Sequence, residues 1–284
     1  MSAALPRSTV PQPAGRAGWP RIALVAVAFL YVGALLIAPL AGIVWTVVKG
    51  GLQVATETFG APDVRHAYQL TGVITVLTVV VTGVVGVIVA LVLTRDRFVG
   101  RRLVSAVVDL PLAVSPVIVG LAAVLLFGRG GWFENFFAAR GIQILFALPS
   151  MVLVTIFICI PFVVREVAPL LQELGTEEED AAGTLGASPV QTFFRVTLPN
   201  IRWGVLYGVA LSAARAMGEI GAVLIVSGAL QGKTETATLY IFRALEERQD
   251  ASAYLVALTL AAVSIVLLAA IELFKQRRVK EMGR

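Results

Sequence analysis

Two opposite charges, Arg215 and Glu219, lie within a segment that is otherwise apolar and rich in small residues. Residues four apart share one face of a helix, so these side chains can neutralise each other. Because each charge would cost about 2.5–3.5 kcal/mol at the centre of a bilayer, we expect the pair to face protein or water. Ser212 and the small neighbours would let a second helix approach closely. Two interpretations stay open: a clamp that fixes helix packing at a subunit interface, and a gate or pathway element.

The sequence lacks the residue groupings that catalysis or metal binding requires. It contains no G-x-x-x-x-G-K-[ST] phosphate loop, no cluster of His and Cys, and no nucleophile beside a base. The single histidine, His66, is expected to have an interfacial role, and the single cysteine, Cys159, a packing role that excludes an intrachain disulfide. We therefore expect this chain to bind no cofactor or metal and not to be an enzyme.

A polar segment from Glu179 to Pro199 separates two apolar stretches and predicts a pair of short helices joined by a bend. Thr176 is expected to cap the first helix, with Glu179 completing a capping box, and Gly186 to end it in a left-handed conformation. Ser188 and Pro189 are typical of the start of a second helix. The first helix has a thin face at Ala181 and Ala182, and the second carries apolar side chains at Val190, Phe193 and Phe194. Such a bend is suited to entering a groove on another protein.

Composition places the elements that carry these residues in a lipid bilayer. The 284 residues are 58% hydrophobic and 14% charged, with a mean hydropathy of +0.87, which is too apolar for a soluble domain of this size. A helix needs roughly 20 apolar residues to cross the hydrocarbon core. Six windows qualify, at about 22–48, 67–94, 103–127, 143–164, 203–228 and 251–274. Because the alternation of barrel strands is absent, the predicted fold is an all-α integral membrane protein with six transmembrane helices.

Helix-disturbing residues concentrate in the third and fourth windows. The third contains Asp109-Leu110-Pro111 and Ser115-Pro116, and the fourth contains Pro149 and Pro161. Breaks at membrane depth are tolerated where the freed backbone groups line a cavity or are covered by protein. These positions predict either translocation surface or simple packing kinks.

Basic residues indicate the orientation of the chain. Of the 23 lysines and arginines, 15 lie in the two ends and in the second and fourth connections between windows, 7 lie in the first, third and fifth connections, and Arg215 lies inside a window. The positive-inside rule therefore predicts that both termini and the Glu179–Pro199 segment are cytoplasmic. We interpret the calculated pI near 9.7 as a result of this asymmetry and expect no nucleic-acid partner.

The windows imply a simple domain organisation. Residues 1–21 are expected to form a flexible cytoplasmic tail, 22–274 a transmembrane domain of six helices with a long cytoplasmic loop at about 165–202, and 275–284 a basic cytoplasmic tail. The first window is too long for a signal-peptide core, so we expect this helix to be retained. Residues 233–248 are expected to form an amphipathic helix at the outer surface, which either seals the bundle or receives an external binding protein.

The polar segment resembles the EAA signature of bacterial ABC importer permeases. The resemblance rests on Asp180-Ala181-Ala182, on Gly186, and on Leu198-Pro199 at the close. Asp180 stands where the signature commonly has Glu, although Glu179 beside it could substitute, and Val196 stands where Ile is common. The resemblance implies that residues 22–274 form a permease domain and that the loop at about 165–202 is a coupling loop, which docks on a separate ATPase.

Three further stretches resemble sulfate/thiosulfate ABC importer permeases, and among them the W-type subunits: DLPLAVSPVIVG, IQILFALPSMVLVTIFICIPFVVREV and ARAMGEIGAVLIVSG. This resemblance implies the type I importer fold, a bacterial inner-membrane location, and a heterodimer with a related T-type permease. It also implies two copies of an ATPase that uses ATP and Mg, and an extracytoplasmic sulfate-binding protein. Alternatives are a permease for another oxyanion such as molybdate and, more remotely, a secondary transporter, a channel or an intramembrane enzyme.

Overall fold

The structure, a computed structural model, describes residues 19–282, and no strand occurs within that range. Its elements in chain order are α1 Trp19–Gly60, α2 Pro62–Arg95, α3 Arg101–Ala113, α4 Pro116–Phe127, α5 Glu134–Ala138, α6 Leu148–Leu174, α7 Glu177–Thr184, α8 Pro189–Thr192, the π-helical turn η1 Phe193–Thr197, α9 Leu198–Met217, α10 Gly221–Ser227, α11 Ala237–Glu246 and α12 Asp250–Met282. The predicted all-α class is confirmed. Most of the expected N-terminal tail lies outside the described residues.

Four helical stretches are long and apolar enough to cross a membrane: Ala23–Gly60, Pro62–Arg95, Leu148–Leu174 and Asp250–Leu273. Two further candidates are bent pairs. Arg101–Ala113 and Pro116–Phe127 meet at 113°, and Pro189–Met217 and Gly221–Ser227 meet at 57°. Counting each bent pair as one span gives the six spans that the windows predict.

Two element boundaries differ from the expected domain limits. Helix α6 continues to Leu174 and α9 begins at Leu198, so the connection expected at about 165–202 is helical at both of its ends. Helix α12 extends through most of the segment 275–284, to Met282. Regular helix therefore reaches further from the apolar windows than hydropathy alone indicates.

The bend in the third window lies where prolines predict it. Val114 and Ser115 have extended backbone conformations, and Pro116 then begins α4. A proline disfavours helical geometry in the residue before it, which explains this boundary. In the fourth window, Pro149 lies in the first turn of α6, and Pro161 lies inside the helix without ending it. The bend between α9 and α10 has no proline and is not predicted by the sequence.

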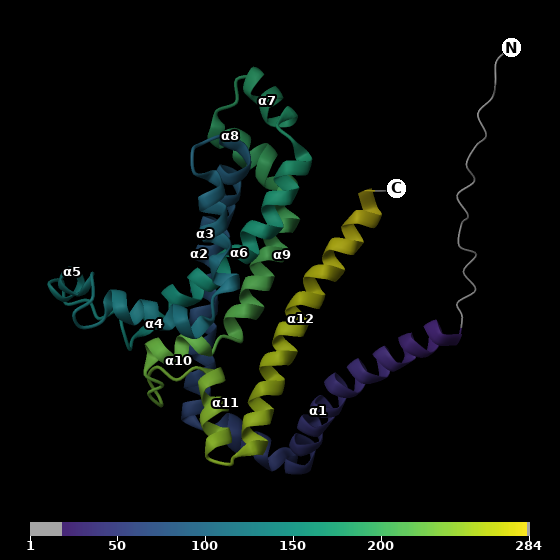
Figure 1. Cartoon of the computed structure of the whole chain (residues 1–284), viewed down its shortest axis with the longest axis vertical. Helices are drawn as coiled ribbons and strands as arrows, with labels where there is room; N and C mark the ends of the chain where they lie inside the picture. Colours follow the sequence, from purple (N-terminus) through teal and green to yellow (C-terminus); the bar gives the residue numbers. More distant parts are fainter. Residues whose placement is uncertain (1–18, 283–284) are drawn as a thin grey trace.

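Helices α2, α6, α9 and α12 run between two ends of the molecule, one carrying α7 and α8 and the other carrying α11 (Figure 1). Helix α6 packs against both α2 and α9. A methyl group added at Gly208 of α9 would lie 2.9 Å from the Cα atom of Val163, and one added at Gly86 of α2 would lie 2.7 Å from its Cβ atom. Because lipid tails are as apolar as leucine, such close approach of small residues is what drives helices together in a bilayer.

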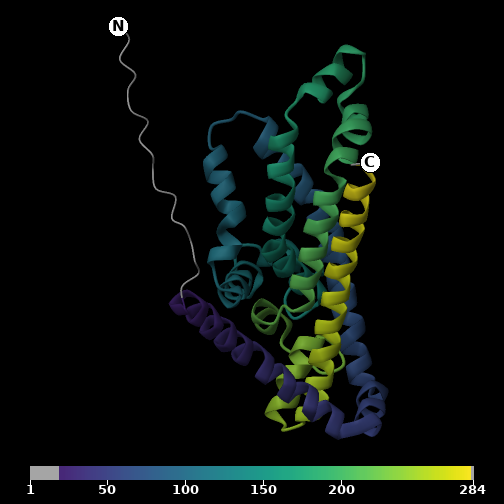
Figure 2. The same cartoon turned by 90° about the vertical axis from the view of Figure 1, so that its right-hand side faces the viewer.

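Two segments leave this bundle. Helix α1 diverges obliquely from the other helices, as the rotated view shows most clearly (Figure 2), and none of its most apolar window is buried. Its backbone is broken at Gly51, where φ is +66°. Helices α4 and α5 project sideways on the other side of the bundle (Figure 1). The chain therefore presents large apolar surfaces that its own residues do not cover.

Candidate functional site

The bend after α7 has the geometry that the sequence predicts. Gly186 has φ +86°, the Ala187 N–H donates to the carbonyl of Ala182 at 3.0 Å, and the Gly186 N–H donates to that of Gly183 at 3.0 Å. This paired arrangement is a Schellman motif, which satisfies carbonyls at a helix end and requires a left-handed residue. The predicted role of Gly186 in the backbone is confirmed.

The second short helix also begins as predicted. The Gln191 N–H donates to Ser188 Oγ at 3.3 Å, the Ser188 N–H donates to Gln191 Oε1 at 2.9 Å, and Pro189 occupies the first helical position. This reciprocal pair is a capping box. From Pro189 the helix continues without a gap through η1 into α9, so the bend is joined rigidly to a membrane helix.

The predicted capping box at the start of α7 is wrong. Thr176 makes no cap hydrogen bond, and its hydroxyl donates to the Asp180 carboxylate at 3.0 Å. Glu179 turns away from the start of its own helix because stronger partners lie elsewhere in the fold. Its carboxylate accepts from the Thr197 hydroxyl at 2.8 Å and forms an ion pair with Arg95 at 3.0 Å.

Arg95, at the last position of α2, is the centre of this interaction. It donates to the carbonyls of Leu171 at 2.9 Å and Gly175 at 2.6 Å, both at the end of α6, as well as to Glu179. The Arg95 and Glu179 side chains are about one-fifth exposed. We call this group, Arg95, Glu179, Thr197 and the two carbonyls, the Arg95 clasp. It joins α2, α6, α7 and η1.

Outside the clasp, three apolar side chains are exposed at the tip of the bend. Leu185 is 89% exposed, Val190 66% and Phe194 60%, whereas Phe193 packs against the apolar cluster between α2, α6 and α9. Asp180 and Ala181 are exposed and Ala182 is half-buried. At the start of α9, Leu198 packs against the same cluster and Pro199 is exposed. Of the residues predicted to hold a partner, Phe193 therefore serves the chain's own core.

The Arg215–Glu219 pair forms as the spacing predicts, with 2.6 Å between Arg215 Nη1 and Glu219 Oε2. The expectation that it lies inside a continuous helix is wrong, because α9 ends at Met217. Glu219 lies in the bend and its Oε1 atom accepts the Ala222 N–H at 2.8 Å, so the carboxylate occupies a free donor at the start of α10. The Glu219 side chain is 1% exposed and that of Arg215 is 31% exposed.

Among the described residues, Ser212 forms no hydrogen bond with either charge. Its hydroxyl donates to the Cys159 carbonyl at 3.3 Å, and the Cys159 thiol donates to the Ser212 carbonyl at 3.6 Å. Both residues are fully buried, so they join α6 to α9. The packing role expected for Cys159 is confirmed.

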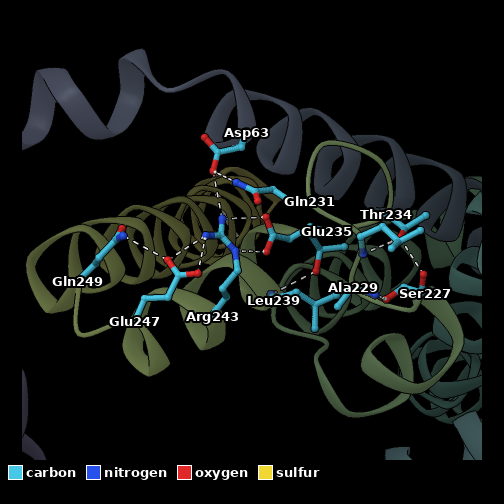
Figure 3. A network of polar contacts seen from close by, with 12 residues as sticks. Asp63, Ser227, Ala229, Gln231, Thr234, Glu235, Leu239, Arg243, Glu247 and Gln249 are labelled. Atoms are coloured by element: carbon cyan, nitrogen blue, oxygen red, sulfur yellow. Dashed lines mark hydrogen bonds and ion pairs between the residues drawn. The ribbon is translucent and has the colours of Figure 1, made fainter.

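A third charged group lies at the α11 end and was not predicted from the sequence (Figure 3). Arg243 of α11 forms ion pairs with Glu235 at 2.7 Å, Asp63 at 3.0 Å and Glu247 at 3.1 Å. The hydrogen bonds that Arg243 donates to the buried Glu235 carboxylate hold the pKa of Arg243 above its ordinary value, so this guanidinium stays charged. We call these four residues the Arg243 cluster. It ties α11 to the start of α2.

Helix α11 was predicted as an amphipathic surface helix, and this chain covers part of its apolar side, whereas Phe242 is 43% and Leu245 is 40% exposed. Ala237, Tyr240 and Ala244 pack with residues of α2 and α12. Arg95 and Arg243 were counted only as basic residues in connections. Glu247, four residues after Arg243, has the spacing of a pair on one helix face, whereas Asp63 and the partners of Arg95 are distant in the sequence. Within residues 19–282, no group of three or more His, Cys, Asp or Glu could hold a metal ion.

Comparison with known proteins gives a family match. Residues 82–280 match the family described as binding-protein-dependent transport system inner membrane component. The sulfate transport system permease protein CysW of Synechocystis sp. is 44% identical over 254 residues, covering 89% of this chain and 92% of that protein. The sulfate transport system permease protein CysT of the same organism is 36% identical over 250 residues, covering 88% of this chain and 87% of that protein.

The fold is also found among solved structures. A bacterial ABC transporter involved in the import of alginate, an acidic polysaccharide, superposes with a TM-score of 0.76, covering 91% of this chain and 96% of that one. Sequence identity is 18%, so the likeness concerns the fold. The predicted type I importer permease fold is confirmed.

Proposed function

Because this chain belongs to the family of binding-protein-dependent transport system inner membrane components, we propose that it is the permease subunit of an ATP-driven importer of sulfate and thiosulfate. We assign the substrate from the names of its relatives, which are sulfate transport system permease proteins. Identity to the W-type sulfate permease of Synechocystis exceeds identity to the T-type permease of the same organism, at 44% against 36%. We therefore assign the W-type role to this chain.

The observation that carries the coupling part of this proposal is the bend between α7 and α8. Its base is braced by the Arg95 clasp, and its tip exposes Leu185, Val190 and Phe194. Gly186 sets the angle of the bend, and Asp180 and Ala181 offer an exposed polar and thin face. A rigid apolar tip on a braced base fits insertion into a groove of an ATPase.

The proposed assembly contains the partners that such an importer needs. A T-type permease forms a heterodimer with this chain, two ATPase copies bind ATP and Mg, and an extracytoplasmic sulfate-binding protein delivers the anion. This chain binds no cofactor and performs no catalysis itself. The uncovered apolar surfaces of α1 and α4 support contact with a second permease and with lipid. A solved alginate importer was obtained with its periplasmic binding protein, which supports delivery from outside.

We place the chain in a bacterial inner membrane with both termini and the α7 end in the cytoplasm. The support is the excess of lysine and arginine on that side. Single cysteines in place of Glu134 and Glu246, in a Cys159→Ala background, should react with an impermeant thiol reagent on intact cells. A cysteine in place of Glu178 should react only after permeabilisation. The opposite pattern would overturn the orientation and the importer assignment.

The assignment is tested by reconstituting the tagged chain with its T-type partner, the ATPase and the binding protein in proteoliposomes. Uptake of radiolabelled sulfate should require ATP and the binding protein, and thiosulfate should compete better than molybdate. Uptake without ATP would instead indicate a secondary transporter. Stronger competition by molybdate would indicate a different oxyanion.

A further inference from the structure

The two bent spans meet at their bends. A methyl group added at Gly221, the first residue of α10, would lie 3.1 Å from Cβ of Pro116, the first residue of α4. One turn later, a methyl group at Gly120 would lie 2.9 Å from the Ala222 carbonyl oxygen. The two half-helices therefore start side by side with their backbones in close contact, as their adjacent positions in Figure 1 also show. Broken helices in membrane proteins are tolerated where they line a cavity or are covered by protein.

Glu219 is fixed at this junction. Its carboxylate accepts the Ala222 N–H, and its backbone carbonyl accepts the Thr238 hydroxyl at 2.8 Å, which ties it to α11. A small cavity of about 10 Å³ beside it is lined in part by Thr71, Thr236 and Thr238. A buried carboxylate with these partners cannot move far without losing hydrogen bonds.

Arg215 has the opposite surroundings. Its side chain is 31% exposed, and among the described residues its guanidinium makes a polar contact with Glu219 alone. A guanidinium carries five N–H donors, so most of them stay available. A pair that served only to clamp helices of this chain would have both partners enclosed. Here the Glu219 carboxylate is enclosed, whereas the Arg215 guanidinium remains partly exposed.

We propose that Arg215 contacts the translocated oxyanion at the junction of α4 and α10, and that Glu219 is its fixed counter-charge. This inference rests on the proposed import of sulfate. The planar guanidinium matches two oxygens of a tetrahedral oxyanion. An isolated cation at this depth would hold a doubly charged anion strongly and release it slowly. Glu219, at 2.6 Å, weakens that attraction and also keeps the arginine in place when no anion is bound.

The experiment compares Arg215→Gln, Arg215→Lys and Glu219→Gln in the complete reconstituted importer, with radiolabelled sulfate as the probe. The matched control is Arg102→Gln, which changes an exposed arginine on α3. We expect Arg215→Gln to lower maximal uptake by about tenfold or more, the factor carried by one charge-assisted hydrogen bond, and Arg215→Lys to recover part of it. Glu219→Gln keeps an acceptor for the Ala222 N–H but removes the counter-charge. It should lower both the half-saturating sulfate concentration and the maximal rate, while the control transports normally.

The outcomes separate the possible failures. If the unaltered importer takes up no sulfate, the proposed function fails. If it takes up sulfate and Arg215→Gln does so equally well, Arg215 is not a pathway residue. If Arg215→Gln fails to assemble, the double variant Arg215→Gln/Glu219→Gln decides. Assembly without uptake supports the proposal, restored assembly with uptake shows a clamp, and continued failure to assemble assigns Arg215 to a contact with the partner permease.

Discussion

Each end of the molecule contains an arginine that joins elements distant in the sequence, but the two arginines bind different kinds of partner. In the Arg95 clasp, the guanidinium uses backbone carbonyls at the end of α6 and one carboxylate, and the adjacent helices leave an apolar tip exposed. In the Arg243 cluster, the guanidinium meets three carboxylates, and Ala237, Tyr240 and Ala244 of α11 are buried against α2 and α12. The comparison indicates that one end is braced for a partner to act on, whereas the other is largely closed by its own residues.

The largest expected effect breaks the closed end. Arg243→Ala leaves Glu235, which is 2% exposed, without its counter-charge. Removing one partner of a buried ion pair lowers the free energy of unfolding by about 3–5 kcal/mol. We expect a loss of about 3 kcal/mol here because Arg243 is itself partly exposed. The measurement is the thermal unfolding midpoint of the purified complex in detergent. Glu247→Gln, at the exposed edge of the same cluster, is the control and should have little effect. Equal effects of both variants would contradict the buried-charge explanation.

Arg95→Ala breaks the braced end. It removes hydrogen bonds to two carbonyls and one carboxylate, and loss of charge-assisted hydrogen bonds costs about 1.5–3 kcal/mol. We expect a smaller loss of stability than for Arg243→Ala, together with more ATP hydrolysed per sulfate imported. Arg97→Ala is the control, since this exposed arginine follows α2 without joining the clasp. Unchanged coupling in Arg95→Ala would mean that the clasp only stabilises the fold.

Gly186→Val tests the bend between the clasp and the tip. A β-branched residue at φ +86° costs on the order of 1–3 kcal/mol and distorts the Schellman motif. ATPase association should fall, while membrane insertion should be unchanged. Gly183→Ala is a matched control on the same short helix, because that glycine has no positive φ and an added methyl group meets no atom within 4 Å. Normal ATPase recovery with Gly186→Val would remove the coupling role of this bend.

The smallest stability effect is expected at the tip itself. Phe194 is 60% exposed, so Phe194→Ala should change the free energy of unfolding by no more than about 0.5 kcal/mol. The same change should reduce co-purification of the ATPase, because an exposed aromatic side chain is a typical interface anchor. Phe193→Ala should show the reverse order, with a larger stability loss, since this neighbour packs in the core. Loss of stability without loss of ATPase for Phe194→Ala would contradict the proposed surface.

The sequence alone determined the features that depend on local pattern. The apolar windows predicted the helical membrane class, the prolines predicted the bend before Pro116, and the segment Gly186-Ala187-Ser188-Pro189 predicted a helix end followed by a helix start. The resemblance to importer permeases is confirmed by the family match. These predictions succeed because hydrophobic length, missing proline N–H groups and left-handed glycine geometry act within one or two helical turns.

Only the tertiary structure decided which charged groups meet when they are distant in the sequence. Arg95 pairs with Glu179, 84 positions away, and Arg243 with Asp63, 180 positions away. Glu179 pairs with that distant arginine and does not form the predicted capping box, since a charge-assisted pair is stronger than a cap hydrogen bond. The bend after α9 also depends on contacts from α4 and α11, and neither is visible in the local pattern. A periodic pattern places a residue on a helix face, but the partner on that face is set by how the helices pack.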